Sequence, residues 1–331
     1  MSKTLVTGGA GFIGSHLAKR LLDEEREVIL ADDFSRGSIL NLSDLNIQIP
    51  CANVDLRDYS QVLKLTEGVD TVFHLAARVG SIKYLHGSDI NELTALQTNL
   101  AIDVNVFKAC LEKNVKNLIY TSSVSVYPID RQNTPNIILS EDAIHYMNPE
   151  GGYGWAKLMA EIELSWMKGI NIAIGRIFNI YGENSALGES AHVIAALIHK
   201  AILYPKEEFR VWGNGEQTRD LLYVGDCVEA LLRLEEKTSN PPIIINIGSG
   251  EATSIRVIAE KIAQLSGKNP EVIYDPTKPV GPLSRTADVN KAKVMLGWQP
   301  KTRMNNGLER TYSWVEKRLS RIGTSKISGK E

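Results

Sequence analysis

The 331-residue sequence lacks features that would place it in several large classes of protein. It has no run of 18 apolar residues, so we expect no membrane span. Its net charge of −2 leaves no basic excess for binding nucleic acid. A predicted strand begins at Lys3 and leaves no room before it for a signal peptide, so we expect a cytoplasmic protein.

Cysteine and histidine are also scarce. The three cysteines, Cys51, Cys110 and Cys227, are far apart and odd in number, which is typical of reduced thiols rather than a disulfide framework. The six histidines do not show metal-ligand spacing, so we expect no metal site. There is no internal repeat or low-complexity linker. The apolar content of 43% supports a substantial core in one large domain or two fused ones.

The most informative segment is rich in glycine. Residues 4–14 read Thr-Leu-Val-Thr-Gly-Gly-Ala-Gly-Phe-Ile-Gly, in which Gly9, Gly11 and Gly14 match the G-x-G-x-x-G pattern between a predicted strand and a predicted helix. Such glycines allow a tight turn and a close approach to a pyrophosphate, which the N-terminus of the helix then binds. A glycine-rich turn can also follow a strand for steric reasons alone, so the surrounding sequence decides.

The next predicted strand supports a dinucleotide site. Residues 27–31 are followed by Asp32, about 20 residues after the glycines, where an acid accepts hydrogen bonds from an adenosine ribose. A carboxylate would repel a 2′-phosphate, so the sequence favours NAD over NADP. Arg36 lies close by in the sequence and keeps NADP open as the alternative.

Strand-like and helix-like segments alternate through the first 180 residues. This alternation predicts an α/β fold with a Rossmann-type, doubly wound parallel sheet. The predicted strands are 3–7, 27–31, 47–52, 70–75, 117–122 and 171–177, and the predicted helices are 11–24, 58–66, 89–113 and 152–167.

The alternation changes after residue 181. We expect a loop at 182–188, a polar glycine-rich segment at 209–225, a strand at 243–247, and helices at 190–203, 226–236, 254–266, 288–296 and 305–318. This pattern predicts an NAD-binding domain over 1–180, a smaller α/β substrate lobe over 181–320 with some crossing of the chain between them, and a frayed tail over 321–331.

Hydroxyl groups follow the predicted strand 117–122. The carboxyl ends of parallel strands line the ligand crevice, so Ser122, Ser123 and Ser125 are candidates to face a substrate. In a strand-end turn, serines can instead bond their own backbone. About thirty residues later, Tyr153 and Lys157 stand at i and i+4 on one helix face. An ammonium beside the phenol would lower the tyrosine pKa from about 10, which favours Tyr153 as a general base.

Together these motifs resemble extended short-chain dehydrogenases/reductases of the NAD-dependent nucleotide-sugar epimerase/dehydratase family. The resemblance runs from about residue 3 to 318 and includes Arg176-Ile-Phe-Asn-Ile-Tyr-Gly182 and Trp212-Gly-Asn-Gly-Glu-Gln-Thr-Arg-Asp220. It implies that Tyr153 is the base, Lys157 holds the nicotinamide ribose, and Ser123 steadies the reacting hydroxyl. It assigns NAD binding to Gly8, Gly11, Phe12, Ile13, Gly14, Asp32, Asp33, Asp55, Leu56, Leu75, Ala76, Ala77, Asn99, Tyr153 and Lys157.

The resemblance also implies a nucleotide-diphosphate sugar as substrate. Asn179, Arg219 and Arg285 would contact it, and guanidinium groups suit a diphosphate because they bind its oxygens bidentately. Either arginine could also be an ordinary surface residue. His192 stands where many relatives place an asparagine beside the diphosphate, or it is a solvated residue at a helix start. Ser125 would line the sugar site.

Relatives commonly form homodimers through the helices that match 89–113 and 152–167. Both carry apolar residues beyond what one sheet contact needs, although these could also belong to the core. The residues are Leu93, Leu96, Leu100, Val104, Phe107, Leu158, Ile162 and Trp166.

The resemblance implies transient oxidation at sugar carbon 4. Family dehydratases carry an Asp-Glu pair where this chain has Val124 and Ser125, which argues against 4,6-dehydration, and the sugar-acid decarboxylases usually carry Glu in place of Ser125. A 4-epimerase of a UDP- or GDP-hexose is the simplest expectation.

Two other activities and one non-catalytic role stay open. The C-terminal half most resembles GDP-mannose 3,5-epimerases, although Ser125 replaces their cysteine and His192 their lysine. A net dehydrogenase or reductase giving a 4-keto sugar is the second alternative. A non-catalytic NAD-binding protein is the third, and the intact Ser123, Tyr153 and Lys157 argue against it.

Overall fold

The computed structural model describes residues 2–144, 147–188 and 191–322. At its centre is a seven-stranded sheet in the order β11-β7-β5-β4-β1-β2-β3, and every neighbouring pair is parallel. This arrangement confirms the predicted Rossmann-type fold. The strands are β1 (Lys3–Thr7), β2 (Glu27–Asp32), β3 (Cys51–Asn53), β4 (Thr71–His74), β5 (Asn117–Ser123), β7 (Asn171–Ile177) and β11 (Ile243–Ile247).

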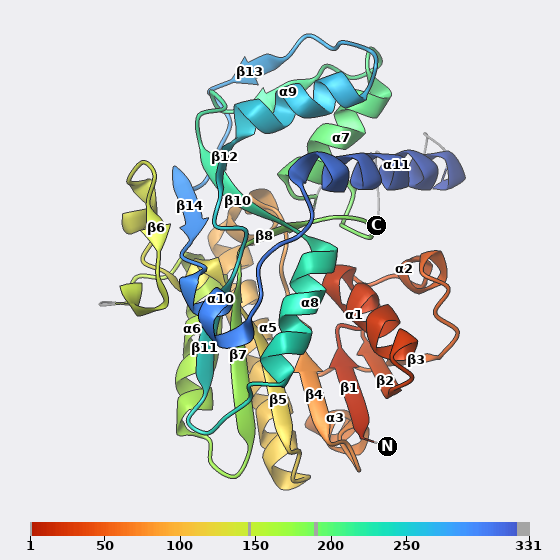
Figure 1. Cartoon of the computed structure of the whole chain (residues 1–331), viewed down its shortest axis with the longest axis vertical. Helices are drawn as coiled ribbons and strands as arrows, with labels where there is room; N and C mark the ends of the chain where they lie inside the picture. The colour runs from red at the N-terminus through yellow and green to blue at the C-terminus, as the bar shows by residue number, and fades with distance from the viewer. Residues whose placement is uncertain (1, 145–146, 189–190, 323–331) are drawn as a thin grey trace.

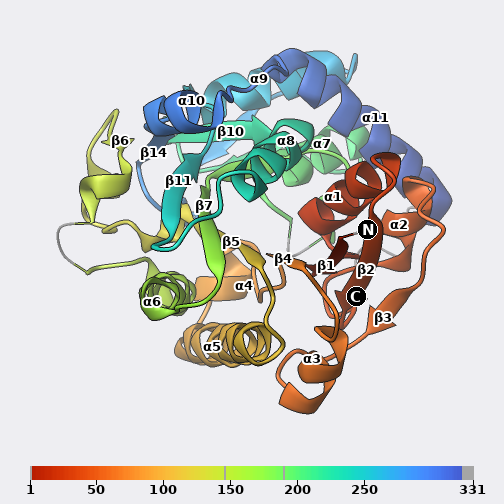
Figure 2. The ribbon, with the colours of Figure 1, turned by 60° about the horizontal axis from the view of Figure 1, so that its bottom comes forward.

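Helices cover both faces of this sheet (Figure 2). One face packs against α1 (Phe12–Asp23) and α8 (Val224–Glu235), in a core that includes Leu17 and Leu231. The other face packs against α3 (Tyr59–Leu65), α5 (Asp89–Glu112) and α6 (Gly151–Trp166), in a separate core. Because both faces are covered, the central strands are nearly continuous apolar runs.

A second lobe lies at one end of the sheet, where Figure 1 shows its helices gathered. The helices are α7 (Val193–Leu203), α9 (Ile255–Leu265) and α11 (Met304–Ile322), which share one apolar core. Its larger sheet has the order β12-β10-β14-β6 with β8 on β10, and β13 pairs with β9. The strands are β6 (Ile138–Leu139), β8 (Asn179–Tyr181), β9 (Arg210–Trp212), β10 (Thr218–Tyr223), β12 (Ala252–Ser254), β13 (Ile273–Asp275) and β14 (Ser284–Ala287).

The chain crosses between the lobes in both directions. Although α8 and β11 follow residue 181, they belong to the layers of the large sheet, and α10 (Asn290–Leu296) packs beside β11. In the opposite direction, β6 leaves the first half and pairs with β14. The functional division at residue 180 stays a prediction.

Several short elements differ from the predictions. The predicted strand 47–52 is formed only at Cys51–Asn53, because Pro50 has no N–H for the ladder. The segment 209–225, predicted only as polar and glycine-rich, contains β9 and β10. The short helices α2 (Ile39–Asp44) and α4 (Ile82–His86) were not predicted, although Ser38 and Ser81 cap them. Three 3₁₀ turns complete the elements: η1 (Val124–Val126), η2 (Arg131–Asn133) and η3 (Glu141–Ala143).

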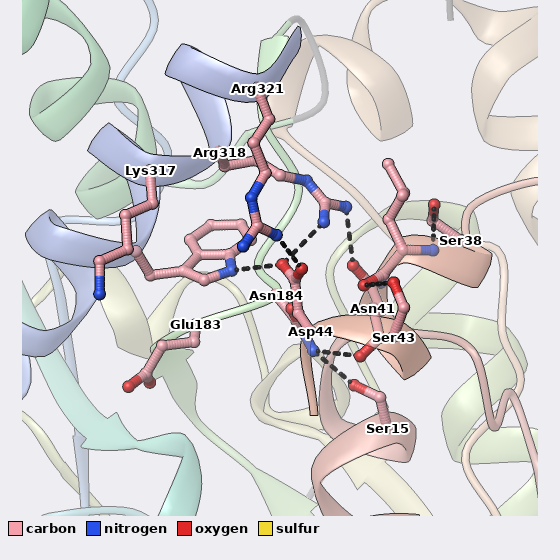
Figure 3. Close-up of polar contacts among 12 residues, drawn as sticks. Ser15, Ser38, Asn41, Ser43, Asp44, Glu183, Asn184, Lys317, Arg318 and Arg321 are labelled. Atoms are coloured by element: carbon pink, nitrogen blue, oxygen red, sulfur yellow. Dashed lines mark hydrogen bonds and ion pairs between the residues drawn. The ribbon is translucent and has the colours of Figure 1, made fainter. Parts of the chain in front are cut away.

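The prediction of a frayed tail from residue 321 is wrong at its start. Helix α11 continues to Ile322, and its end is bound to α2 (Figure 3). Asp44 accepts hydrogen bonds from Arg318 Nη1 at 2.9 Å, from Arg321 Nη1 at 2.6 Å and from Trp314 Nε1 at 3.2 Å. These bonds hold the last turns of the helix. Residues 323–331 lie outside the described residues.

A buried ion pair connects α6 with β7. Glu161 and Arg176 each have 4% exposed side chains, and Arg176 Nε and Nη2 donate to the two carboxylate oxygens at 3.0 and 2.8 Å. Arg176 Nη1 also donates to the Tyr127 hydroxyl, and Ser122 Oγ donates to Glu161. Ser122 therefore points into the protein, which corrects the expectation that it faces a substrate.

This pair generates a stability prediction. In Arg176→Met, the Glu161 carboxylate would stay buried without its partner, so we expect the free energy of unfolding to fall by about 3–5 kcal/mol. Urea denaturation followed by circular dichroism measures the change. The double variant Arg176→Met/Glu161→Leu, with no buried charge left over, should recover most of the loss. A loss for Arg176→Met of at most about 1 kcal/mol, the size typical of an exposed pair, would contradict the prediction.

Candidate active site

The site lies where the strands of the large sheet end. Parallel register aligns Thr7 of β1 with His74 of β4, and His74 with Tyr120 of β5. It also aligns Ser123, the last residue of β5, with Ile177 of β7. The carboxyl ends of four strands therefore share one edge, which is where open α/β sheets bind ligands.

The glycine turn after β1 is built for a pyrophosphate. Helix α1 begins at Phe12, and no side chain caps it at Gly11, so the first N–H groups of the helix remain available. A Cβ at Gly14 would lie 2.0 Å from the carbonyl oxygen of Gly8, so only glycine allows this packing. The turn, with the N–H groups of Phe12 and Ile13 in the first turn of α1, fits the diphosphate of a dinucleotide.

Asp32 ends β2 beside this turn. Its carboxylate accepts hydrogen bonds from the backbone N–H of Ala10 at 3.1 Å and of Phe34 at 2.9 Å. Burial raises the pKa of Asp32, and these backbone bonds oppose that change. A Cβ at Gly37 would lie 2.6 Å from the carboxylate oxygens, so glycine lets the next loop close over Asp32. The neighbouring Asp33 accepts from Ser35.

The other residues assigned to NAD occupy different surroundings. The backbone N–H groups of Leu75 and Ala76 donate to Thr7 Oγ1, which fixes the chain after β4. Ala77 is the next residue of this segment. Asn99 Oδ1 accepts from the backbone of Arg78 at 2.7 Å, so Asn99 holds this same segment. Asp55 is ion-paired with Arg57, and Leu56 is buried. Their contacts with a cofactor stay predictions.

The three predicted catalytic residues come together at the end of β5. Ser123 and Tyr153 are each 8% exposed and share a hydrogen bond, while Lys157 is 1% exposed. Ser123 Oγ also accepts from the backbone N–H of Ser125 at 3.1 Å. A hydroxyl, a phenol and an ammonium at one strand end can hold a substrate hydroxyl and accept its proton.

The predicted lowering of the tyrosine pKa by Lys157 is wrong for the protein alone. Burial raises the pKa of Tyr153, and Asp103 and Glu150 raise it further, while the hydrogen bond with Ser123 opposes them. Burial likewise lowers the pKa of Lys157, and Asp103 and Glu161 oppose this. Desolvation is therefore the largest influence on the pKa of both side chains.

A buried polar network lies next to Lys157. The sequence analysis did not predict it. Asp103 of α5 is 2% exposed, and it bonds His74 Nε2 at 3.0 Å and accepts from the Tyr120 hydroxyl at 2.8 Å. Thr7 Oγ1 bonds the other ring nitrogen of His74 at 2.7 Å. The ammonium of Lys157 lies 4.4 Å from the centre of the Tyr120 ring. The network thus connects β1, β4, α5 and β5 to the candidate lysine.

The sequence analysis also missed a second carboxylate, that of Glu150, which lies beside Ser125. Glu150, three residues before Tyr153, accepts a hydrogen bond from Ser125 Oγ at 3.0 Å and an ion-paired hydrogen bond from Arg285. No local pattern in the sequence indicates this contact, because Glu150 and Ser125 belong to different elements. The structure therefore places a carboxylate next to Ser125, a position at which the sequence itself has no acidic residue.

The predicted substrate residues of the second lobe are partly brought together. Arg219 and Arg285 occupy paired positions on β10 and β14 and are 7% and 8% exposed, so the reading as surface arginines is wrong. Asn179 begins β8, and its Oδ1 is buried without a partner among the described residues. His192 immediately precedes α7 and is exposed. Its contact with a diphosphate stays a prediction.

Comparisons with known proteins agree with this geometry. The model of the NAD-dependent epimerase/dehydratase family matches residues 4–248. GDP-mannose 3,5-epimerase of Arabidopsis thaliana is 33% identical over 342 residues, which covers 99% of this chain and 88% of that protein. The chain belongs to the NAD-dependent epimerase/dehydratase family.

Solved structures of two UDP-glucose 4-epimerases extend the comparison. The Thermotoga maritima enzyme, solved with UDP-glucose, has a TM-score of 0.85 at 29% identity, covering 96% of this chain and 99% of that one. The Thermus thermophilus enzyme, solved with NAD, has a TM-score of 0.80 at 26% identity, covering 95% and 98%. The cofactor of this family member is NAD. No helix among the described residues is long and apolar enough to cross a membrane.

The His74 network predicts how stability depends on pH. Burial lowers the pKa of His74, although Asp103 opposes it, so the folded protein keeps this ring neutral. The unfolded chain protonates it below about pH 6.5. The unfolded state then binds more protons, so the free energy of unfolding should decrease as the pH falls from about 6.5 to 5, by up to about 1.4 kcal/mol per unit for one histidine.

The variant His74→Asn isolates this effect. It lacks the titrating ring, so the slope of its unfolding free energy against pH should be smaller over the same range. Urea denaturation at several pH values gives both slopes. Equal slopes for the variant and the parent would show that His74 does not titrate on unfolding.

Proposed function

We propose that the protein is a nucleotide-sugar epimerase that retains NAD and acts by transient oxidation at sugar carbon 4. The observation that supports it is the convergence of Ser123, Tyr153 and Lys157 at the sheet edge, beside a glycine turn that fits a dinucleotide. Bound NAD supplies the hydride acceptor of the half-reaction. Epimerisation then needs no second base, because a 4-keto sugar can rotate within the site and take the hydride back on its other face.

Each residue of the trio has a distinct role. Tyr153 accepts the proton of the carbon-4 hydroxyl, and its hydrogen bond with Ser123 favours the ionised phenol. Ser123 positions the same hydroxyl through a hydrogen bond. Lys157 holds the nicotinamide ribose; burial lowers the pKa of its ammonium group, and the nearby Asp103 and Glu161 oppose this change. Buried groups of this kind act strongly because water does not screen them.

Two other activities have specific support. The 33% identity to a GDP-mannose 3,5-epimerase over nearly the whole chain supports GDP as the nucleotide. A net oxidation that stops at the 4-keto sugar would use the same trio. Incubating the purified protein with UDP-, GDP- and dTDP-sugars, followed by sugar analysis and mass spectrometry, separates these. An epimer at carbon 4 supports the proposal, and an epimer at carbon 3 or 5 supports a 3,5-epimerase. A stable keto sugar with NADH formation supports the dehydrogenase.

The proposed base generates a first prediction. Tyr153→Phe keeps the ring and removes the proton acceptor, so turnover should fall about 10²–10⁴-fold while NAD and sugar nucleotide still bind. Steady-state kinetics and titration calorimetry measure the two effects. Ser123→Ala should also lower turnover, through the loss of one hydrogen bond. A Tyr153→Phe enzyme that turns over the true substrate like the parent would falsify the mechanism.

Ser125→Ala serves as the matched comparison. If Ser125 only lines the site, its loss should change turnover little. If it takes part in proton transfer at carbons 3 or 5, its loss should stop solvent deuterium from entering the sugar while oxidation at carbon 4 continues. Mass spectrometry of the product formed in D₂O separates the two roles.

We also propose that the protein forms a homodimer through α5 and α6. The two helices pack side by side and present exposed apolar residues: Leu93, Val104, Trp155, Met159 and Trp166. Trp166 is 75% exposed, which is unusual for so large an apolar side chain. Phe107 and Leu158, which we expected in this contact, are buried in the subunit's own cores instead.

The dimer proposal predicts the mass in solution. Multi-angle light scattering at micromolar concentration should give twice the 36.6 kDa of the chain. Trp166→Glu would introduce a charge into the proposed contact and should shift the protein to monomers, whereas Lys168→Glu, just beyond α6, should not. A parent protein that is monomeric at this concentration rejects the proposal.

A further inference from the structure

The carboxylate of Glu150 is fixed within the candidate sugar site. Its Oε2 accepts hydrogen bonds from Ser125 Oγ and Arg285 Nη2, and its backbone N–H donates to the carbonyl of Ser125 at 2.8 Å. Ser125 in turn donates its backbone N–H to Ser123 Oγ. Two hydrogen bonds therefore separate this negative charge from the serine that would hold the reacting hydroxyl.

Glu150 also changes the charge that the site offers to a substrate. Arg285 uses Nη2 for Glu150 and Nε for Gln132 Oε1, at 2.5 Å for the latter. Arg219, by contrast, donates its guanidinium hydrogens to the carbonyl oxygens of Thr218, Val280 and Pro282, which are neutral acceptors. Burial and the nearby Arg285 lower the pKa of Arg219 to about 9.

The balance of these charges matters for substrate choice. A nucleotide diphosphate brings two negative charges, and Arg219 and Arg285 are the buried cations at paired positions of β10 and β14. Glu150 offsets one of them. A sugar that carries a carboxylate would add a third negative charge beside Glu150, where little water screens the repulsion. A neutral hexose would instead donate hydroxyl hydrogen bonds to the same carboxylate.

We propose that Glu150 is a specificity-determining residue that makes the site select nucleotide-diphosphate hexoses with neutral sugars over those whose sugar bears a carboxylate. This inference rests on the proposed function, because it requires a nucleotide-sugar site at Ser123, Ser125 and Arg285. It goes beyond that function by naming the charge class of the sugar and the residue that sets it.

Binding of matched ligand pairs tests the proposal. Titration calorimetry in a Tyr153→Phe background, in which turnover should be about 10²–10⁴-fold slower, gives dissociation constants for UDP-glucose and UDP-glucuronate, and for GDP-mannose and GDP-mannuronate. UDP and GDP alone show which nucleotide the site accepts. For that nucleotide, we expect the neutral sugar to bind at least about tenfold more tightly than the uronate, since like charges a few ångströms apart repel strongly in a poorly screened site.

The variant Glu150→Gln removes the charge and keeps the shape. The ratio of the two dissociation constants should then move by at least about tenfold toward the uronate. Asp142→Asn makes the same change of charge at an exposed residue of η3 and should leave the ratio unchanged.

The outcomes separate the two proposals. Two results overturn the role of Glu150 and leave the epimerase proposal intact. In the first, the parent protein binds the uronate as tightly as the neutral sugar. In the second, Glu150→Gln changes the ratio of the two dissociation constants no more than Asp142→Asn does. Failure to bind UDP, GDP, dTDP or any of their sugars overturns the proposed function itself. A parent protein whose preference for the neutral sugar is below tenfold overturns the inference whether or not Glu150→Gln folds.

Discussion

The structure depends on balancing charges that are buried between the helices α5 and α6 and the large sheet. Lys157 and Arg176 are the cations there, and Asp103 and Glu161 are the anions; all four are at most 4% exposed. A buried charge without a partner destabilises a fold by several kcal/mol, so neither helix can shift without a large loss. Tyr153 lies on α6 one turn before Lys157, so this balance also fixes the phenol against Ser123 at the end of β5.

The glycine turn after β1 is held by residues from both ends of the chain. Ser38 and Asn41 each bond the carbonyl oxygen of Ala10 in the glycine turn, at 3.0 and 2.9 Å. Arg318, near the end of α11, donates to Asn41 and to Asp44 of the same short helix (Figure 3). The C-terminal helix therefore supports the glycine turn after β1. The second lobe is thereby tied to the edge of the large sheet where β1 ends.

Sequence patterns predicted the elements whose formation depends on nearby residues. Apolar strands and long amphipathic helices indicated the large sheet, and the spacing of Tyr153 and Lys157 indicated the base and its neighbour. Short or polar elements such as β6 and β10 were missed, because their pairing depends on residues far away in the chain. Asp103 and Glu150 were missed for the same reason. The sign of the Tyr153 pKa shift could not be predicted either, because burial decides it and burial comes only from the tertiary fold.

Glu150 also changes the reason for excluding carboxylate-assisted dehydration. The sequence argues against it because Val124 and Ser125 follow Ser123, but the fold brings the carboxylate of Glu150 next to Ser125 from another element. Although burial raises the pKa of Glu150, the charge and hydrogen bond of Arg285 lower it below its usual range. A carboxylate stabilised in its ionised form by an arginine is a weak proton acceptor and cannot donate a proton near neutral pH. In the proposed mechanism, proton transfer is therefore assigned to Tyr153, and the Glu150 carboxylate is proposed to act through its charge.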